Sequence, residues 1–336
     1  MSGLVAITGG TGHIGNNLTR ALIAERRRLR LLIYTEPQGL DGLDFERVAG
    51  DVLDPASLDR AFDGAEVVYH VAGRISIYRD AALVHKVNVL GTRNVVEACL
   101  RAKVSRLVHV SSVHAFTQEP FNEPIRESHP LVTDRRALPY DRSKADGERE
   151  IQAGIAKGLD ATIVNPSGVI GPYDFAPSRM GDMLLRLAKR TLPGLMRAGY
   201  DFVDVRDVVA GAIAAETRGR TGQHYLLTGA YVSLKELAAL SSELTGTPAP
   251  RIVSPIWLSR FGVPFMTLWA FLTKTQPLVT QESISILAGN GHFRHDLAAE
   301  ELGYKARPLV ETLSDTYAWF RSQGLLPELS PALLPS

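Results

Sequence analysis

The chain of 336 residues is poor in cysteine and almost without net charge. Its one cysteine, Cys99, cannot form a disulfide within the chain, which fits a reducing compartment, and we expect a cytoplasmic protein. Because Cys99 lies in a helical run of apolar residues, its thiol is expected to be buried and structural rather than reactive. The formal net charge of +1 gives no reason to expect nucleic acid as a partner.

The sequence also lacks a long apolar run. The N-terminus, MSGLVAITGG, has no basic region followed by an apolar stretch and a cleavage site, so we expect no signal peptide. The most apolar stretch, 256–272, is short for a membrane span and contains Arg260, Gly262 and Pro264. A spanning helix is therefore not expected there. The alternatives are a pair of packed helices, which we favour, a lid over a cleft, and a peripheral contact with a membrane surface.

The first two-thirds of the chain alternate regularly between strand-like and helical patterns. Six short runs rich in Val and Ile are bounded by Gly, Asp or Ser, which is typical of strands. They are residues 4–8, 29–34, 45–50, 67–72, 106–111 and 161–165, with helical patterns at 16–24, 56–62, 88–102 and 143–157. This alternation predicts an α/β fold of the Rossmann type, a doubly wound parallel sheet with helices on both faces.

The alternation stops after about Pro166, where Gly, Pro and aromatic residues become frequent. A strand-like run, 224–228, then lies between helical segments 205–216 and 234–244, and a helix at 314–323 closes the chain. We therefore expect the chain to leave the first domain and cross back into it. The predicted units are a dinucleotide-binding domain of 1–167 and 203–229, a smaller substrate-binding α/β domain of 168–202 and 230–325, and a loose tail of 326–336.

Three glycines, Gly9, Gly12 and Gly15, follow the first strand in a GxxGxxG spacing. Glycine there permits a tight turn and lets the backbone approach a pyrophosphate, while the helix that starts near His13 offers its N–H groups and positive dipole end. The last glycine permits close packing of helix and strand. A glycine-rich turn without a ligand is the structural alternative, but the strand before it and the helix after it are the context that a dinucleotide site requires.

The second strand ends at Tyr34, and Glu36 follows two residues on. In this fold an acidic residue at that place favours the free ribose hydroxyl of NAD, whereas an arginine favours NADP. No basic residue lies between Ile33 and Gly42, so the sequence favours NAD over NADP without excluding the latter. Asp51, after the third strand, is placed either to accept from the adenine amino group or to form a turn. The histidines show no metal-ligand spacing, and no metal is expected.

Tyr140 and Lys144 lie four residues apart, on one face of a predicted helix. An ammonium group beside a phenol favours the phenolate and lowers a pKa that is ordinarily about 10. Such a phenol is able to exchange a proton with a carbonyl or hydroxyl group. Ser112, at the carboxyl end of the fifth strand, is the hydroxyl expected to position the substrate oxygen. The alternatives are a surface Tyr–Lys pair and a serine that caps a helix or turn.

Further motifs accompany this set in order along the chain. They are TGGTGHIG (8–15), HVAG (70–73), NVLGT (88–92), VSS (110–112), YDRSK (140–144), NPS (165–167) and GP (171–172). Together they resemble the extended short-chain dehydrogenase/reductase family, which includes NAD-dependent epimerases and dehydratases. The resemblance is nearest to the branch of dihydroflavonol 4-reductases and 3β-hydroxysteroid dehydrogenases, and it continues through Arg294 and 302–304 to Trp319 and Phe320.

The resemblance implies roles for the catalytic set. Tyr140 is the proton donor or acceptor, Lys144 binds the nicotinamide ribose and lowers the pKa of the tyrosine, and Ser112 polarises the substrate oxygen. The nicotinamide exchanges a hydride with the substrate carbon. A homodimer through helices 88–102 and 143–157 is implied as well. The expected cofactor contacts are Gly9, Thr11, Gly12, His13, Ile14, Gly15, Tyr34, Asp51, Val52, Val71, Ala72, Gly73, Asn88, Ser111, Tyr140, Lys144, Asn165, Pro166 and Ser167.

Two features bear on the substrate. Sugar-nucleotide members of the family usually carry an arginine where this chain has Tyr200, which puts a pyrophosphate clamp in doubt. Arg206 lies instead at a helical position, where pairing with a neighbouring acid is expected, and Asp207 is expected to cap or anchor that helix. The apolar stretch 256–272 is the second feature, because such a stretch is able to line a pocket for a flat hydrophobic molecule. The expected substrate contacts are Ser112, Met180, Met183, Trp257 and Phe261.

Three functions follow, in order of preference. The first is an NAD(P)-dependent oxidoreductase that interconverts a ketone and a secondary alcohol on a hydrophobic, cyclic substrate of the dihydroflavonol or 3β-hydroxysteroid kind. The second is a nucleotide-sugar epimerase or dehydratase. The third is a non-catalytic NAD(P)-binding redox sensor, which is disfavoured because such sensors commonly lose the set of Ser112, Tyr140 and Lys144 that is whole in this chain.

Overall fold

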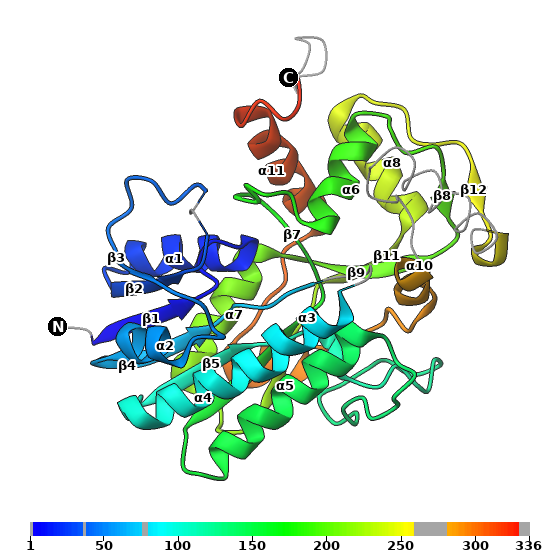
Figure 1. The fold of residues 1–336 in the computed structure, drawn as a ribbon. Helices are drawn as coiled ribbons and strands as arrows, with labels where there is room; N and C mark the ends of the chain where they lie inside the picture. The colour runs from blue at the N-terminus through cyan, green and yellow to red at the C-terminus, as the bar shows by residue number, and fades with distance from the viewer. Residues whose placement is uncertain (1–2, 36–37, 76–79, 259–280, 329–336) are drawn as a thin grey trace.

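The computed structural model describes residues 3–35, 38–75, 80–258 and 281–328, and its centre is a seven-stranded sheet in the order β10-β6-β5-β4-β1-β2-β3 (Figure 1). Every pairing in this sheet is parallel. The strands are β1 (Leu4–Thr8), β2 (Arg28–Ile33), β3 (Glu46–Ala49), β4 (Ala65–His70), β5 (Arg106–Val110), β6 (Ala161–Pro166) and β10 (His224–Leu227). The predicted doubly wound Rossmann sheet is confirmed, with strand ends that differ from the predicted ones by at most two residues.

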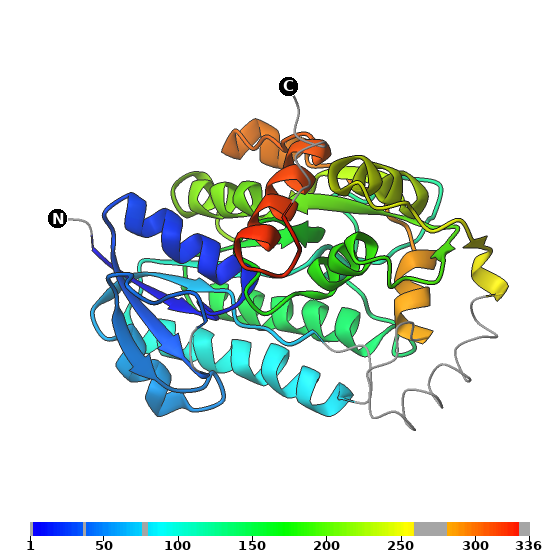
Figure 2. The ribbon, with the colours of Figure 1, turned by 90° about the horizontal axis from the view of Figure 1, so that it is seen from above.

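Helices cover both faces of the sheet (Figure 2). One apolar core joins α1 (His13–Ala24) and α7 (Val205–Arg218) to the strands, and a second joins α2 (Pro55–Phe62), α4 (Gly91–Ala102) and α5 (Pro139–Ile155) to the opposite face. The central strands β1, β5 and β6 are buried along their whole length, which explains their continuous apolar sequences. Cys99 lies in the second core, where burial raises the pKa of its thiol, as a structural cysteine requires.

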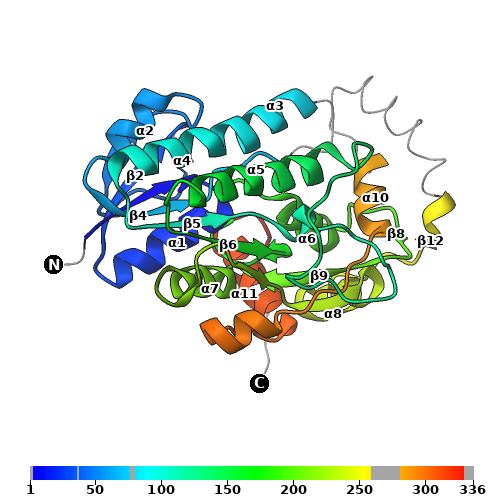
Figure 3. The same cartoon turned by 90° about the horizontal axis from the view of Figure 1, so that it is seen from below.

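The helix that carries Asn88 is longer than the sequence predicted. It begins with α3 (Ala81–His85), continues through a π-helical turn at Lys86–Leu90 and runs on as α4, seen beside α5 in Figure 3. The predicted start at residue 88 was therefore wrong. The wider π-helical turn places Asn88 among buried residues, and turns of this kind are frequent at functional sites.

The remaining elements form a smaller layer beside the sheet. β9 (Gly199–Asp204) pairs in parallel with β7 (Gly168–Ile170) and antiparallel with β11 (Ala230–Ser233), and β8 (Leu195–Met196) pairs with β12 (Val253–Ser254). The sequence did not predict these short strands, because they lie in a region rich in Gly and Pro. Four helices accompany them, namely α6 (Arg179–Ala188), α8 (Leu234–Thr245), α10 (Gln281–Ala288) and α11 (Leu309–Ser322), and α6, α8 and α11 share a third apolar core.

Two sequence predictions concern segments that lie partly outside the described residues. The apolar stretch 256–272 lies outside them from residue 259 onward, and so does the tail from 329. Across the ranges that are described, no helix combines the length and apolar character needed to cross a membrane. The domain boundaries and the homodimer remain predictions.

Candidate active site

The carboxyl ends of the parallel strands meet at one edge of the sheet, the edge at which this fold binds dinucleotides. The strand order reverses between β1 and β4, which marks the crevice for the cofactor. Predicted site residues stand at or just after six of these seven ends. Gly9 follows β1, Tyr34 follows β2, Asp51 and Val52 follow β3, Val71, Ala72 and Gly73 follow β4, Ser111 and Ser112 follow β5, and Asn165, Pro166 and Ser167 end or follow β6.

The glycine loop after β1 is shaped by close backbone contacts. Gly9 has a φ of +74°, and a Cβ there would overlap the backbone of Ala72. A Cβ at Gly15 would overlap the carbonyl oxygen of Gly9, so α1 packs directly onto the turn. Gly12 is the exposed N-cap residue of α1, and no side chain caps this end of the helix. The first backbone N–H groups of α1 therefore face outward. This backbone-lined loop fits a pyrophosphate group.

Two alanine variants are expected to separate folding from cofactor binding in this loop. Gly15→Ala should lower the free energy of unfolding by about 1–3 kcal/mol, because its methyl group overlaps Gly9. Gly12→Ala should keep wild-type stability, since its Cβ would lie 3.6 Å from the nearest atom, the Gly9 carbonyl oxygen. It should nevertheless weaken NAD binding by about tenfold or more, because the methyl group stands where a phosphate approaches. Thermal unfolding and calorimetric titration measure the two effects, and unchanged NAD affinity in Gly12→Ala would contradict the assignment.

Tyr140 and Ser112 come together from α5 and the end of β5. Pro139 starts α5 at its first turn, where its missing N–H is harmless, and the next residue, Tyr140, is buried. Ser112 accepts a hydrogen bond from the backbone N–H of His114 at 3.3 Å, which is the capping role considered from the sequence. Burial raises the pKa of Tyr140 to about 12, and the nearby hydroxyl of Ser112 opposes this rise.

Lys144 lies one turn further along α5 and is buried as well. Its ammonium group donates to the carbonyl oxygen of Val110 at 3.3 Å, and a Cβ at Gly73 would lie 3.4 Å from its Nζ. Burial lowers the pKa of Lys144 to about 8, and the charge of Glu148 opposes this. The sequence predicted that Lys144 lowers the pKa of Tyr140, but the structure differs, because burial dominates at the phenol and the ammonium is directed at Val110.

The side-chain amide of Asn88 joins the loop after β4 to α5. Its Oδ1 accepts from the backbone N–H of Arg74 at 2.7 Å. Its Nδ2 donates to the carbonyl of Arg74 at 3.0 Å and to the hydroxyl of Ser143 at 2.9 Å. The side chain therefore fastens the loop after β4 to α5, next to Gly73.

Three residues of the site were not predicted, and they form one line of polar contacts. The phenol of Tyr200 and the Nε2 of His114 share a hydrogen bond of 2.7 Å, and the Nδ1 of His114 lies 3.1 Å from the carboxylate of Asp141. The ring of His114 stands edge-on to Tyr140, with centroids 5.6 Å apart. Burial raises the pKa of Tyr200, and the nearby Tyr140 adds to this. His114 and Asp141 are sequence neighbours of Ser112 and Tyr140, which is the signal that could have found them.

The predicted adenosine contacts lie at the other end of the crevice. Tyr34 is 75% exposed, and Glu36 falls outside the described residues. The carboxylate of Asp51 accepts from the backbone N–H of Leu53 at 3.0 Å, so it forms the turn that was one of its two interpretations. His13, in the first turn of α1, is 3.0 Å from the carbonyl oxygen of Pro172 through its Nε2.

The predicted substrate contacts are scattered. Met180 and Met183, on α6, pack against the third apolar core. Trp257 is 62% exposed, and Phe261 lies outside the described residues. Ser112 is the one predicted substrate contact beside Tyr140. Among the residues that the structure describes, no cluster of His, Cys, Asp and Glu fits a metal ion.

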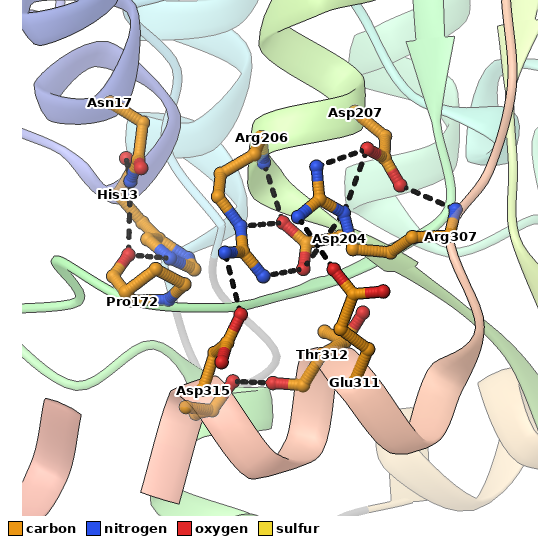
Figure 4. A network of polar contacts seen from close by, with 11 residues as sticks. His13, Asn17, Pro172, Asp204, Arg206, Asp207, Arg307, Glu311, Thr312 and Asp315 are labelled. Carbon is orange, nitrogen blue, oxygen red and sulfur yellow. Dashed lines mark hydrogen bonds and ion pairs between the residues drawn. The ribbon is translucent and has the colours of Figure 1, made fainter. Parts of the chain in front are cut away.

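Arg206 and Asp207 belong to an ionic network at the start of α7 (Figure 4). Arg206 pairs with Asp204 at 2.7 Å and with Asp315 of α11 at 2.7 Å, so the predicted pairing with a neighbouring acid is confirmed. The residue that caps α7 is Asp204, which accepts from the N–H of Arg206. Asp207 binds Arg307 at 2.8 Å and thereby anchors the segment before α11.

The sheet, the glycine loop and the strand-end site are those of a dinucleotide-binding protein of the Rossmann class. The chain belongs to the NAD-dependent epimerase/dehydratase family, whose model matches residues 5–228. This confirms the resemblance to extended short-chain dehydrogenases/reductases, and NAD is the cofactor that the family description names.

Similar proteins extend over nearly the whole chain. The chain is 34% identical to sterol demethylase protein B of Methylococcus capsulatus, over 95% of this chain and 99% of that protein. It is 32% identical to a protein of Synechocystis provisionally named as a dihydroflavonol 4-reductase, over 95% and 94% of the two chains. The crystal structure of gox2253 superposes with a TM-score of 0.84 at 31% identity and covers 96% of this chain and 99% of its own. The predicted proximity to dihydroflavonol reductases is thus confirmed.

Proposed function

We propose that this protein is an NAD-dependent oxidoreductase that reversibly reduces a ketone on a hydrophobic, cyclic substrate, with Tyr140 as the general acid. The observation that carries the proposal is that Tyr140, Ser112 and Lys144 gather at the rim of the sheet, with Lys144 against Gly73. These groups stand at the carboxyl ends of β4 and β5, on the side to which the glycine loop opens.

Each group has a task in the proposed reaction. The nicotinamide supplies or takes up the hydride. Tyr140 donates its phenolic proton to the substrate oxygen, and its raised pKa keeps that proton in place at neutral pH. Ser112 donates to the same oxygen and fixes its position. Lys144 holds the ribose side of the cofactor next to Gly73, as the family resemblance implies.

The surroundings of Tyr140 favour an apolar ring over a nucleotide sugar. The ring of Tyr200 lies 6.1 Å from that of His114 and 6.4 Å from that of Phe293, which makes an aromatic wall beside the phenol. Such walls bind flat apolar rings through their faces and edges. Arg206, six residues after Tyr200, is held by two acids. The names of the two relatives, which refer to sterols and dihydroflavonols, support the same substrate class.

Epimerisation of a nucleotide sugar is the second candidate, because the family description includes epimerases. It needs the same tyrosine and also a cationic group that holds the pyrophosphate. Tyr200 stands where sugar-nucleotide members of the family usually carry an arginine, and its side chain has no positive charge. A non-catalytic redox sensor is the third candidate. It would have no use for a buried Tyr140 with a serine hydroxyl nearby, and burying such groups is costly without a function.

One assay distinguishes the three candidates. The protein is mixed with NADH, and in parallel with NADPH, and offered dihydroflavonols, 3-ketosteroids, simple cyclic ketones and UDP-sugars. We expect the absorbance of the reduced cofactor to fall with a polycyclic ketone and faster with NADH than with NADPH. Conversion of a UDP-sugar without net cofactor change, detected by chromatography, would identify an epimerase and overturn the ketoreductase. Tight NADH binding without turnover of any compound would favour the sensor.

A further inference from the structure

Glu148 is a carboxylate completely buried beneath the site. It lies one turn after Lys144 on α5 and faces the sheet, with no exposed surface. Its Oε1 accepts a hydrogen bond of 2.6 Å from the amide of Asn165. Its Oε2 lies 3.3 Å from the Nδ1 of His224, and its charge acts on the Lys144 ammonium.

His224 connects this carboxylate with the outside. It begins β10, which is the edge strand of the seven-stranded sheet, and its side chain is 16% exposed. Lys144, Glu148 and His224 therefore lie in a line of polar groups that leads from the catalytic rim toward the surface, beside the buried side chains of His109 and Asn165. The Nδ1 of His109 and the Oδ1 of Asn165, beside this line, have no hydrogen-bond partner within the described ranges. Buried polar atoms without a hydrogen-bond partner are uncommon in folded proteins, and a functional role is one explanation for them.

The charges that face Glu148 decide which group of the line changes its protonation. Burial raises the pKa of Glu148 to about 7, while Ser111, Asn165, Lys144 and Arg149 lower it. Burial also lowers the pKa of His224 to about 4 and that of His70 to about 3, and it lowers that of His109. These histidines are therefore neutral near pH 7, and the members of the cluster that exchange protons in this range are Glu148, with a pKa of about 7, and Lys144, with a pKa of about 8.

We propose that Glu148 and His224 form the route by which Lys144 exchanges a proton with solvent during the reaction. In ketone reduction, Tyr140 breaks its O–H bond to protonate the substrate oxygen. The Lys144 ammonium then leaves the carbonyl of Val110 and breaks an N–H bond to restore the phenol. The Glu148 carboxyl group then gives its proton to the Lys144 amine. Water protonates the carboxylate again through His224, so that one solvent proton is consumed for each hydride transferred. Glu148 does not touch the substrate and acts on the reaction only through Lys144.

The proposal rests on the proposed oxidoreductase function, but its test requires no substrate. NAD⁺ carries a positive nicotinamide ring and NADH does not. Binding of NAD⁺ near Lys144 should therefore favour the charged form of Glu148 and release a proton near pH 7, and NADH should release less. Calorimetric titration in two buffers of different ionisation enthalpy measures the number of protons released. We expect clear release with NAD⁺ in the wild type and at least a threefold smaller release in Glu148→Gln.

Two further variants make the test specific. Glu150→Gln alters an acid of the same helix that pairs with Arg93 on the surface, and it should release protons as the wild type does. Glu148→Asp keeps a carboxylic acid and should recover the release that Glu148→Gln loses. Unchanged release in Glu148→Gln, with NAD⁺ still bound, would overturn the relay even if the ketone assay succeeds. A failed ketone assay with the expected proton release would instead leave the relay standing and refute the reductase.

Discussion

Replacing Tyr140 by Phe is expected to lower ketone turnover by about 10²- to 10⁴-fold, because it removes the group that protonates the substrate oxygen. The change keeps the ring that packs against His114, and it deletes only the hydroxyl that meets Ser112. NAD affinity and thermal stability should stay close to those of the wild type, since the glycine loop and Lys144 are untouched. Steady-state kinetics with NADH, together with a calorimetric titration of NAD, measure the two properties separately.

Tyr317→Phe is the matched control for this loss. Tyr317 is also a buried tyrosine, and its hydroxyl donates to Ser241 at 2.7 Å in the third apolar core, away from the strand ends. Its loss should reduce stability by about 1 kcal/mol without changing kcat. Equal turnover in Tyr140→Phe and wild type would remove Tyr140 from the mechanism, and a loss of NAD binding in the same variant would show that it acts on the cofactor site instead.

The pH dependence of turnover offers a second view of the same site. Lys144 is charged below its pKa of about 8 and becomes neutral as the pH rises through that value. If its charge holds the cofactor and restores the phenol, kcat/KM should fall as the pH rises through this range. Tyr140, whose pKa is about 12, remains protonated throughout and cannot account for the decline.

The parts of the structure that follow from local periodicity could be predicted from the sequence. The strands could be predicted because apolar residues dominate the buried central strands of a parallel sheet, and the glycine loop lies where strand and helix meet. Tyr140 and Lys144 share a helix face because residues four apart do so in any helix. Ser112 reaches them because the carboxyl ends of parallel strands meet at one edge.

The parts that depend on contacts between distant residues could not be predicted in this way. Tyr200 and His114 are 86 residues apart, and nothing in either local pattern brings them together. The pKa of Tyr140 was expected to fall because a lysine lies one turn away, but burial proves stronger than this neighbour. Glu148 carries no local signal of its role, because an acid on an amphipathic helix is ordinarily exposed, and here the sheet covers it.

Asp204→Asn is expected to destabilise the fold by about 3 kcal/mol. The Asp204 side chain has no exposed surface and lies 2.7 Å from Arg206 and 3.5 Å from Arg307. Asparagine keeps the volume and is still able to cap α7, so the variant removes the charge alone. The cost stays at the low end of the usual ~3–5 kcal/mol for breaking a buried pair, because each arginine retains another acid.

The acid dependence of stability identifies the charge as the cause. Burial raises the pKa of Asp204, but the hydrogen bonds and charges of Arg206 and the charge of Arg307 outweigh it and leave the pKa below its ordinary value. Its stabilising contribution is therefore fully present above the unfolded-state pKa and disappears as the pH falls through the lower folded-state pKa. The difference between wild type and Asp204→Asn in urea unfolding should shrink over that acidic range.

Asp182→Asn provides the control for this variant. Asp182 pairs with Arg186 one turn along α6, and both side chains are largely exposed, so its replacement should change stability by no more than about 0.5 kcal/mol. A comparable loss in both variants would mean that any acid-to-amide change weakens the fold. A loss confined to Asp204→Asn would show that the network at the start of α7, which fastens α11 beside the phosphate loop, depends on one buried charge shared by two arginines.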